Sequence, residues 1–227
     1  MLILALDTAG RVASAALCRD GAVIAHCERD SMMDHSRTIL PVCEEMLAGQ
    51  GLSLKDIDVF AAVCGPGSYT GIRIGVAAVK GFAFGCDRLC VAVSTLEAAA
   101  WADNAVSGPK LAVVQARPGE YYAARFEQSG AQTVRVTPDG VMTQDEIAAL
   151  WQREPLRICG SGAQALCAAL GIPESQAGAV QDASSAARCA YDRAGRGQAV
   201  SCHDIKPSYL RPTQAERMKQ QKEEKQL

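Results

Sequence analysis

Residues 2–21, LILALDTAGRVASAALCRDG, decide the fold because the same design returns later in the chain. An apolar stretch, a polar turn, a second apolar stretch and a final glycine predict two paired strands closed by a glycine turn. Residues 111–130, LAVVQARPGEYYAARFEQSG, follow the same order. Gly10 in the first segment and Gly119 in the second mark the same place.

A second pair of matching segments follows the first pair. Residues 63–68 read VCGPGS and residues 158–163 read ICGSGA, each an apolar strand, then C-G-x-G, then a small residue that opens a helix. Two matches in the same order indicate a duplicated lobe. Strands and helices that alternate in two similar halves predict an α/β fold with two lobes, the architecture of actin-like and Hsp70-like ATPases. That analogy decides no function.

The lobe boundary is expected at DNAVSGPK, residues 103–110, which combines turn residues with Gly and Pro. We therefore predict a first lobe over residues 1–105 and a second lobe over residues 106–206. Residues 207–227 are predicted to form a charged C-terminal tail, because ERMKQQKEEKQL has no apolar face.

Three helix starts can be predicted from local patterns. Asp34 is expected to cap a helix over residues 35–49, in which Pro41 either introduces a kink or marks where the regular part begins. Capping boxes are expected at STLE, from Ser94, and at TQDE, from Thr143. The predicted apolar stripe of the first helix comprises Ile39, Leu40, Cys43, Met46 and Leu47.

Composition is that of an ordinary globular protein. The chain has 227 residues, 48% of them hydrophobic and 21% charged, and a net charge of −2. A protein that binds RNA by itself normally carries a stripe of basic residues on its surface, and no Lys/Arg run supplies one.

The ten cysteines form no C-x-x-C pair, which predicts buried, reduced thiols in a cytoplasmic protein. No signal-peptide or membrane-span pattern is found.

The turn GPGSYTG, residues 65–71, is a candidate phosphate loop. Its G-x-G-x-x-x-G spacing differs from the dinucleotide fingerprint by one residue, and Ile72 and Arg73 stand where a P-loop has Lys and Ser or Thr. What remains is a turn whose N–H groups open a helix, a generic anion site. On the alternative interpretation, Ser68 or Thr70 only caps that helix.

Asp7 ends the first predicted strand and has two interpretations. A carboxylate there attends a metal–nucleotide in the actin-like class, whereas an aspartate in a turn commonly caps the N–H groups of the next residues, here Thr8 and Ala9. The equivalent region of the second segment offers Gln115 and Ala116 and no acid. A phosphoryl-transfer site with two carboxylates is therefore incomplete.

The helix after the turn carries four glycines, Gly71, Gly75, Gly81 and Gly85, with Ala78 between the pairs. Each costs about 1 kcal/mol relative to alanine in a helix interior, so about 3 to 4 kcal/mol must be offset. Small residues one turn apart let another backbone come very close. The neighbour is either part of the same chain or another subunit.

Histidines do not supply a metal site. A helical metal pair needs a second ligand three to five residues after the first, and no such ligand follows His35. There is also no G-x-S-x-G signature of a Ser-His-Asp hydrolase. We expect His35 to be a helix-start residue.

Five motifs in order resemble the TsaB family, an accessory subunit of bacterial tRNA threonylcarbamoyladenosine synthesis. The G-P-G-S-[YF]-T-G-[IV]-R block is highly specific, and the resemblance extends over nearly the whole chain. The motifs are ILALDTA from residue 3, HSRTILP from 35, GPGSYTGIRIG from 65, VSTLEAAA from 93 and YLRPTQAER from 209. The family has the actin-like, Hsp70-like (ASKHA) fold. It is similar to the catalytic subunit TsaD but lacks that subunit's metal-binding H-x-x-x-H.

The resemblance implies a scaffold without catalytic residues, metal or cofactor of its own. TsaB pairs with TsaD as a heterodimer and works with the small ATPase TsaE, and these partners use ATP and metal. Together they transfer a threonylcarbamoyl group to the adenosine next to the anticodon in tRNAs that read codons beginning with A. The resemblance implies tRNA contact only through the complex, and leaves open whether a homodimer competes with the heterodimer. One departure is QAR at Gln115, where the family usually has DAR.

The resemblance also implies which residues matter. In the family, the helix after the G-P-G-S turn and the helix after the H-S motif build a bundle with their counterparts in TsaD. The expected vestigial nucleotide/phosphate loop comprises Asp7, Thr8, Gly65, Gly67, Ser68 and Thr70. The expected subunit interface comprises His35, Ile39, Cys43, Met46, Leu47, Gly71, Gly75, Ala78, Val79 and Phe82.

A stand-alone enzyme, either an actin-like kinase or a metalloprotease-like hydrolase, is the alternative function. Such an enzyme needs a metal pair or a second acid. The sequence offers neither at the expected places, which favours the scaffold.

Overall fold

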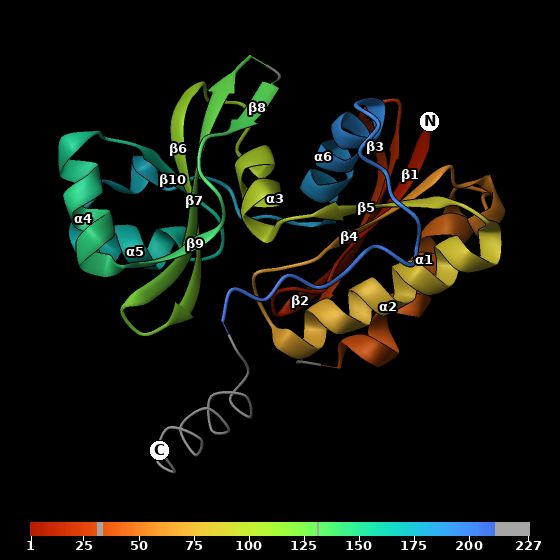
Figure 1. Cartoon of the computed structure of the whole chain (residues 1–227). Helices are drawn as coiled ribbons and strands as arrows, with labels where there is room; N and C mark the ends of the chain where they lie inside the picture. The colour runs from red at the N-terminus through yellow and green to blue at the C-terminus, as the bar shows by residue number, and fades with distance from the viewer. Residues whose placement is uncertain (31–33, 131, 212–227) are drawn as a thin grey trace, which may run out of the picture.

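The computed structural model describes residues 1–30, 34–130 and 132–211 and shows two lobes side by side (Figure 1). Each lobe contains a mixed sheet with helices packed against it. The predicted α/β fold with two lobes is therefore confirmed. No helix among these residues has the length and apolar character needed to cross a membrane.

The first lobe is built on a five-stranded sheet in the order β3-β2-β1-β4-β5. α1 and α2 cover one face of the sheet and α6 covers the other (Figure 1). Its elements are β1 (Leu2–Asp7), β2 (Val12–Arg19), β3 (Ala22–Asp30), α1 (His35–Gly49), the 3₁₀ turn η1 (Leu54–Asp56), β4 (Val59–Val63), α2 (Tyr69–Cys86), β5 (Leu89–Val93) and α6 (Ala183–Gly195).

The second lobe has a sheet in the order β10-β6-β7-β8, with β9 also paired to β7. α3 (Thr95–Ala102) packs against α6 on one side and β6 on the other, so it lies between the lobes. The remaining elements are β6 (Gly108–Arg117), β7 (Glu120–Ser129), β8 (Gln132–Arg135), β9 (Gly140–Thr143), α4 (Gln144–Arg153), β10 (Arg157–Cys159), α5 (Ala163–Leu170) and the 3₁₀ turn η2 (Glu174–Gln176).

The duplication is confirmed at the level of strand pairing. β1 pairs antiparallel with β2 and parallel with β4, and β6 pairs antiparallel with β7 and parallel with β10. Each parallel partner, β4 or β10, ends at the C-G-x-G turn, which opens α2 in the first lobe and α5 in the second. The repeated sequence pattern thus encodes a repeated unit of three strands and a helix.

The second lobe ends earlier than the expected range of residues 106–206. α6 packs on β1 and β2 of the first sheet, where Ala183, Ala186 and Ala190 are fully buried. The reason is that β1 and β2 are apolar on both faces and need a cover on the side opposite α1 and α2. An alanine stripe lets a helix pack closely, but in the sequence it does not say on which sheet.

The C-terminal tail also differs from its expected start at residue 207. Residues 207–211 are described and contact the first lobe, where the Ser208 N–H donates a hydrogen bond of 2.7 Å to the Cys64 carbonyl. The charged segment ERMKQQKEEKQL lies outside the described residues.

Helix starts follow the local patterns with two exceptions. α1 covers the predicted range and continues through Pro41, but the Asp34 side chain makes no cap, because its backbone (φ −98°, ψ 49°) is outside the extended geometry of an N-cap. Leu40 is 43% exposed and does not belong to the buried stripe. The capping box at Thr143 is confirmed.

The capping box expected at Ser94 is only half formed. Ser94 Oγ accepts from the N–H groups of Leu96 and Glu97, so the cap itself is present. The Glu97 carboxylate does not return to the cap; it binds Arg193 at 3.0 Å and lies 3.6 Å from Arg135. Hydrogen bonds between charged groups are stronger than a bond from the neutral N–H of the cap, so the carboxylate pairs with the two arginines.

All ten cysteines are free, and eight of them are buried. Burial raises the pKa of the Cys64 and Cys159 thiols to about 12. Such thiols act as small apolar side chains in the core at neutral pH.

The expected subunit interface is mostly inside this chain. A Cβ on Gly71 would lie 2.0 Å from the Thr8 carbonyl oxygen, and one on Gly75 would lie 2.5 Å from the Thr8 hydroxyl. The prediction that these two glycines admit another subunit is therefore wrong, because β1 of the same chain occupies the space. The other expected interface residues that are buried in the core of the first lobe are His35, Ile39, Cys43, Met46, Leu47 and Val79, whereas Ala78 and Phe82 are partly buried.

We expect Gly71→Ala to lower the free energy of unfolding of the isolated chain by about 1 to 3 kcal/mol, the usual cost of overpacking. The new methyl group meets backbone, which has no rotamer to yield. Gly81→Ala is the matched control, since a Cβ at Gly81 meets nothing within 4 Å. It should stabilise the helix by up to about 1 kcal/mol. Urea denaturation measures both, and equal effects of the two substitutions would contradict the packing described.

Candidate functional site: the cleft between the lobes

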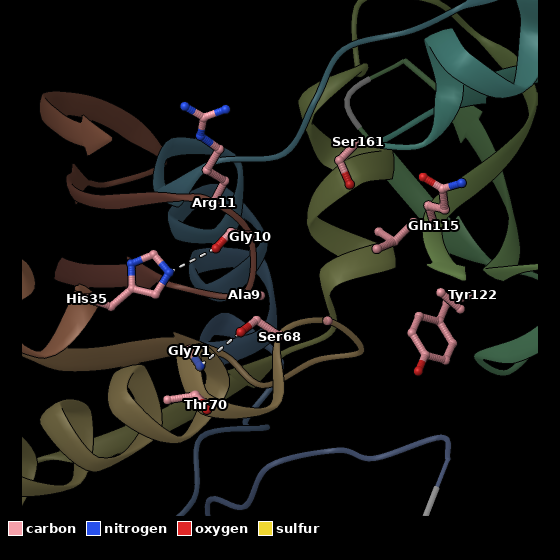
Figure 2. Close-up of a pocket in the computed structure, with 13 residues that line it drawn as sticks. Ala9, Gly10, Arg11, His35, Ser68, Thr70, Gly71, Gln115, Tyr122 and Ser161 are labelled. Atoms are coloured by element: carbon pink, nitrogen blue, oxygen red, sulfur yellow. Dashed lines mark hydrogen bonds between the residues drawn. The ribbon is translucent and has the colours of Figure 1, made fainter. Parts of the chain in front are cut away.

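A cleft of about 930 Å³ lies between the lobes, and both lobes line it (Figure 2). Its first-lobe wall is formed by the β1–β2 turn, the start of α1 and the start of α2. Its second-lobe wall is formed by the end of β6, by β7 and by the C-G-S-G turn. The first-lobe residues are Ala9, Gly10, Arg11, His35, Gly67, Ser68, Thr70 and Gly71, and the second-lobe residues are Val114, Gln115, Ala116, Tyr122 and Ser161.

Asp7 holds the β1–β2 turn and does not line the cleft. Its Oδ1 accepts a hydrogen bond of 2.8 Å from the Ala9 N–H. Burial raises the pKa of Asp7 to about 6; the bond from Ala9 opposes this shift and the negative charge of Asp182 adds to it. Of the two interpretations of Asp7, the turn cap is the one that the structure shows.

Ser68 caps α2. Its Oγ accepts from the Gly71 N–H at 3.2 Å, and its own N–H donates to the Ala9 carbonyl at 2.8 Å. The capping interpretation of this turn is therefore confirmed for Ser68. These bonds join the turn before α2 to the β1–β2 turn and make the first-lobe wall continuous.

The expected phosphate loop is only partly assembled at the cleft. Gly67, Ser68 and Thr70 line it, whereas Asp7, Thr8 and Gly65 lie outside its lining. Thr8 instead donates from Oγ1 to the Gly71 carbonyl at 2.7 Å. The loop's own contacts thus occupy a large part of its hydrogen-bonding capacity.

His35 opens α1, as expected, and also supports the cleft. It is 3% exposed, and its Nε2 lies 2.9 Å from the Gly10 carbonyl oxygen (Figure 2). Nearby, Arg11 pairs with Asp30 at 2.8 Å. His35 therefore fixes the start of α1 against the β1–β2 turn.

The second-lobe wall was not identified as a site from the sequence. Gln115 and Ala116 lie near the end of β6, Tyr122 lies on β7, and Ser161 belongs to the C-G-S-G turn. Figure 2 shows Gln115, Tyr122 and Ser161 across the cleft from Ser68. The signal for Ser161 was present, because the C-G-S-G turn matches the C-G-P-G turn opposite. Tyr122 carries no such signal.

A metal-bound nucleotide does not fit the donor set of the cleft. Among the described residues that line it, none is Asp or Glu, and Mg²⁺ is bound through carboxylate oxygens in most nucleotide sites. Gln115 and Ala116 lie in the region of the second lobe that corresponds to Asp7, and neither is an acid. Over the described ranges, no group of three or more His, Cys, Asp or Glu side chains is placed to hold a metal.

Two similar lobes, each with antiparallel and parallel strands followed by a helix, and a cleft between them define the actin-like, Hsp70-like class. The structure of YeaZ from Pseudomonas aeruginosa matches with a TM-score of 0.78 at 24% identity, covering 92% of this chain and 99% of that one. The activator of the 2-hydroxyisocaproyl-CoA dehydratase from Clostridium difficile, with bound ADPNP, matches with a TM-score of 0.51 at 11% identity, covering 92% and 100%. Both likenesses concern the fold.

Sequence comparison gives the family. Residues 29–159 match the sequence model of TsaD, the tRNA N6-adenosine threonylcarbamoyltransferase. The chain belongs to this family.

Two similar curated proteins carry the name tRNA threonylcarbamoyladenosine biosynthesis protein TsaB. The Escherichia coli protein is 41% identical over 131 residues, 56% of each chain. The Bacillus subtilis protein is 29% identical over 222 residues, 95% of this chain and 96% of that one. The matched region thus spans little more than half of the E. coli relative and nearly all of the B. subtilis relative.

The raised pKa of Asp7 predicts a pH-dependent stability. Its contribution is fully present below the unfolded pKa near 3.8 and is lost as the pH rises through about 6. Asp7→Asn keeps an acceptor for the Ala9 N–H and cannot ionise. We expect its stability relative to the unchanged chain to rise between about pH 4 and pH 7, by about 3 kcal/mol at most.

Urea denaturation of both chains across this pH range measures the difference. If the free energy of unfolding of the two chains changed with pH in parallel, burial would not disfavour the charged form of Asp7.

Proposed function

We propose that this chain is a TsaB-type subunit in the biosynthesis of tRNA threonylcarbamoyladenosine. The observation that carries the proposal is the 41% identity to the E. coli protein of that name, together with the family match over residues 29–159. The near-complete alignment with the B. subtilis protein supports the same role for the whole chain.

The proposed role is that of a scaffold and activator rather than a catalyst. In support of it, Asp7 is buried and bound to Ala9, and Gln115 stands at the matching place in the second lobe. Asp7 also lies outside the lining of the cleft, so its carboxylate does not face a group bound there. In this proposal, ATP and metal act in the partner subunits and this chain has no cofactor of its own.

The proposed partners are TsaD, as the other half of a heterodimer, and TsaE. Thr8 occupies the space beside Gly71 and Gly75, so the partner has to approach the outer face of α2. Ala77, Gly81 and Gly85 are exposed there, and the two glycines have open space at their Cβ positions. Leu40 of α1 is exposed as well. The proposal includes a cytoplasmic location, tRNA contact only through the complex, and a homodimer as the assembly of the free chain.

Restoration of the modified nucleoside tests the function. In a bacterial strain depleted of its own TsaB, expression of this chain together with the TsaD of its own organism should restore threonylcarbamoyladenosine in bulk tRNA. Mass spectrometry of digested tRNA measures the ratio of modified to total adenosine. TsaD expressed alone is the control.

Unrestored tRNA in cells that contain both folded proteins would overturn the proposal. The purified chain should also leave ATP intact in the presence of a divalent metal. Turnover that persists through extensive purification would favour the stand-alone enzyme instead.

The outer face of α2 gives a prediction about the complex. Gly81→Leu should leave the isolated chain folded, since the new side chain meets open space, and should weaken TsaD binding roughly ten- to a hundredfold. Gly195→Leu is the matched control: it lies at the end of α6, on the opposite face of the sheet, and also has open space. Titration calorimetry with TsaD compares the two. Unchanged binding of the Gly81 variant would place the partner elsewhere.

A further inference from the structure

The two lobes are joined covalently at two crossings that touch each other. One runs from α3 to β6 through Asp103, and the other runs from η2 to α6. The Asp103 carboxylate accepts from the Ala179 N–H at 3.4 Å, and a Cβ on Gly178 would lie 2.7 Å from that carboxylate. Arg157 of β10 binds the same carboxylate at 2.6 Å. Hinges are formed by a few residues in loops or at the ends of elements, and these two neighbouring crossings offer such residues at one place between the lobes.

A third crossing exists near the cleft. Residues 207–211, here called the C-terminal strap, leave the first lobe beside α2 and end near the second lobe (Figure 1). The strap continues the chain from the first lobe. It is attached to the second lobe only through non-covalent side-chain contacts.

The strap is seated on the turn that leads into α2. The Ser208 N–H donates to the Cys64 carbonyl at 2.7 Å, and a Cβ on Gly65 would lie 2.5 Å from the Ser208 carbonyl oxygen. Gly65 also has a φ of +111°, which L side chains rarely adopt. Glycine at this place therefore lets the strap lie directly on the turn.

Tyr209 fastens the strap to the first turn of α2. Its ring lies 4.8 Å from that of Tyr69, and its hydroxyl accepts a hydrogen bond of 2.7 Å from Arg73 Nε. The Arg73 guanidinium lies 4.0 Å above the Tyr69 ring. These three side chains form one stacked cluster, in which Tyr69 and Tyr209 remain 40% and 41% exposed.

The far end of the strap reaches the second lobe. Arg211 forms an ion pair with Glu120, the first residue of β7. Glu120 also pairs with Arg117 across the β6–β7 turn. Gln115 and Ala116, near the end of β6, line the cleft, as do Ser68 and Thr70 on either side of Tyr69. The strap therefore joins two elements whose neighbouring residues form opposite walls of the cleft.

We propose that the strap is a latch that fixes the separation of the lobes and hence the width of the cleft. With the hinge at Asp103, a fastening between the start of α2 and the β6–β7 turn opposes rotation that opens the cleft. Release of Arg211 from Glu120 lets the lobes move apart while each keeps its own core. The latch acts in the isolated chain, whatever its partners.

Distance measurement across the lobes tests the latch. Spin labels on noncanonical residues at Glu44 of α1 and Gln152 of α4, both exposed, avoid the ten cysteines. Double electron–electron resonance then measures the distribution of distances between the two labels in the full chain and in the Glu120→Gln variant. We expect a narrow distribution in the full chain, and a broader one with a longer mean distance in the variant. Tyr209→Ala should show the same shift.

Three controls separate the latch from other effects. Arg117→Gln removes the other ion pair of Glu120 and should leave the distribution unchanged. A chain that ends after Arg211 should match the full chain, whereas one that ends after Pro207 should match Glu120→Gln. Circular dichroism confirms that each variant is folded. The proposal is overturned if Glu120→Gln leaves the distances unchanged, or if Arg117→Gln shifts them equally.

Discussion

The contact between Thr8 and the first turns of α2 is the constraint on which the first lobe depends. The Thr8 hydroxyl donates to the Gly71 carbonyl, and the missing side chains of Gly71 and Gly75 let the helix lie directly against the end of β1. This approach brings the Ser68 N–H to the Ala9 carbonyl. The wall of the cleft, the cap of α2 and the seat of the strap all follow from the position of that helix.

Much of the fold was predictable because its signals are local. The strand pairs and the C-G-x-G turns follow from short-range alternation and turn chemistry, which repeat in the two halves of the chain. The capping box at Thr143 is local in the same way. The place of α6 and the path of residues 207–211 depend on contacts between distant segments, such as Ser208 with Cys64, which no local pattern encodes.

For Asp7 and Ser68, the simpler of the two interpretations of the sequence agrees with the structure. Asp7 as a turn cap and Ser68 as a helix cap are what the structure shows, whereas the residues of the second-lobe wall were missed. Gly71 and Gly75 do admit a close neighbour, as predicted, but that neighbour is Thr8 of the same chain and not another subunit. At about 100° per residue, Gly75 and Gly81 point roughly 120° apart around the helix, so the two glycine pairs face different directions. The spacing of the glycines along the helix, which can be read from the sequence, therefore places Gly71 and Gly75 against the end of β1 and Gly81 and Gly85 on the outer side.

The cleft keeps the shape of a ligand site while its polar groups bind one another. Asp7 holds Ala9, Thr8 holds Gly71, and Ser68 holds both turns together. An anion at the start of α2 has to compete with these bonds, and a metal has no carboxylate to bind on either wall. The Ala9 N–H binds Asp7 although burial disfavours the charged carboxylate, so the β1–β2 turn is held at an electrostatic cost.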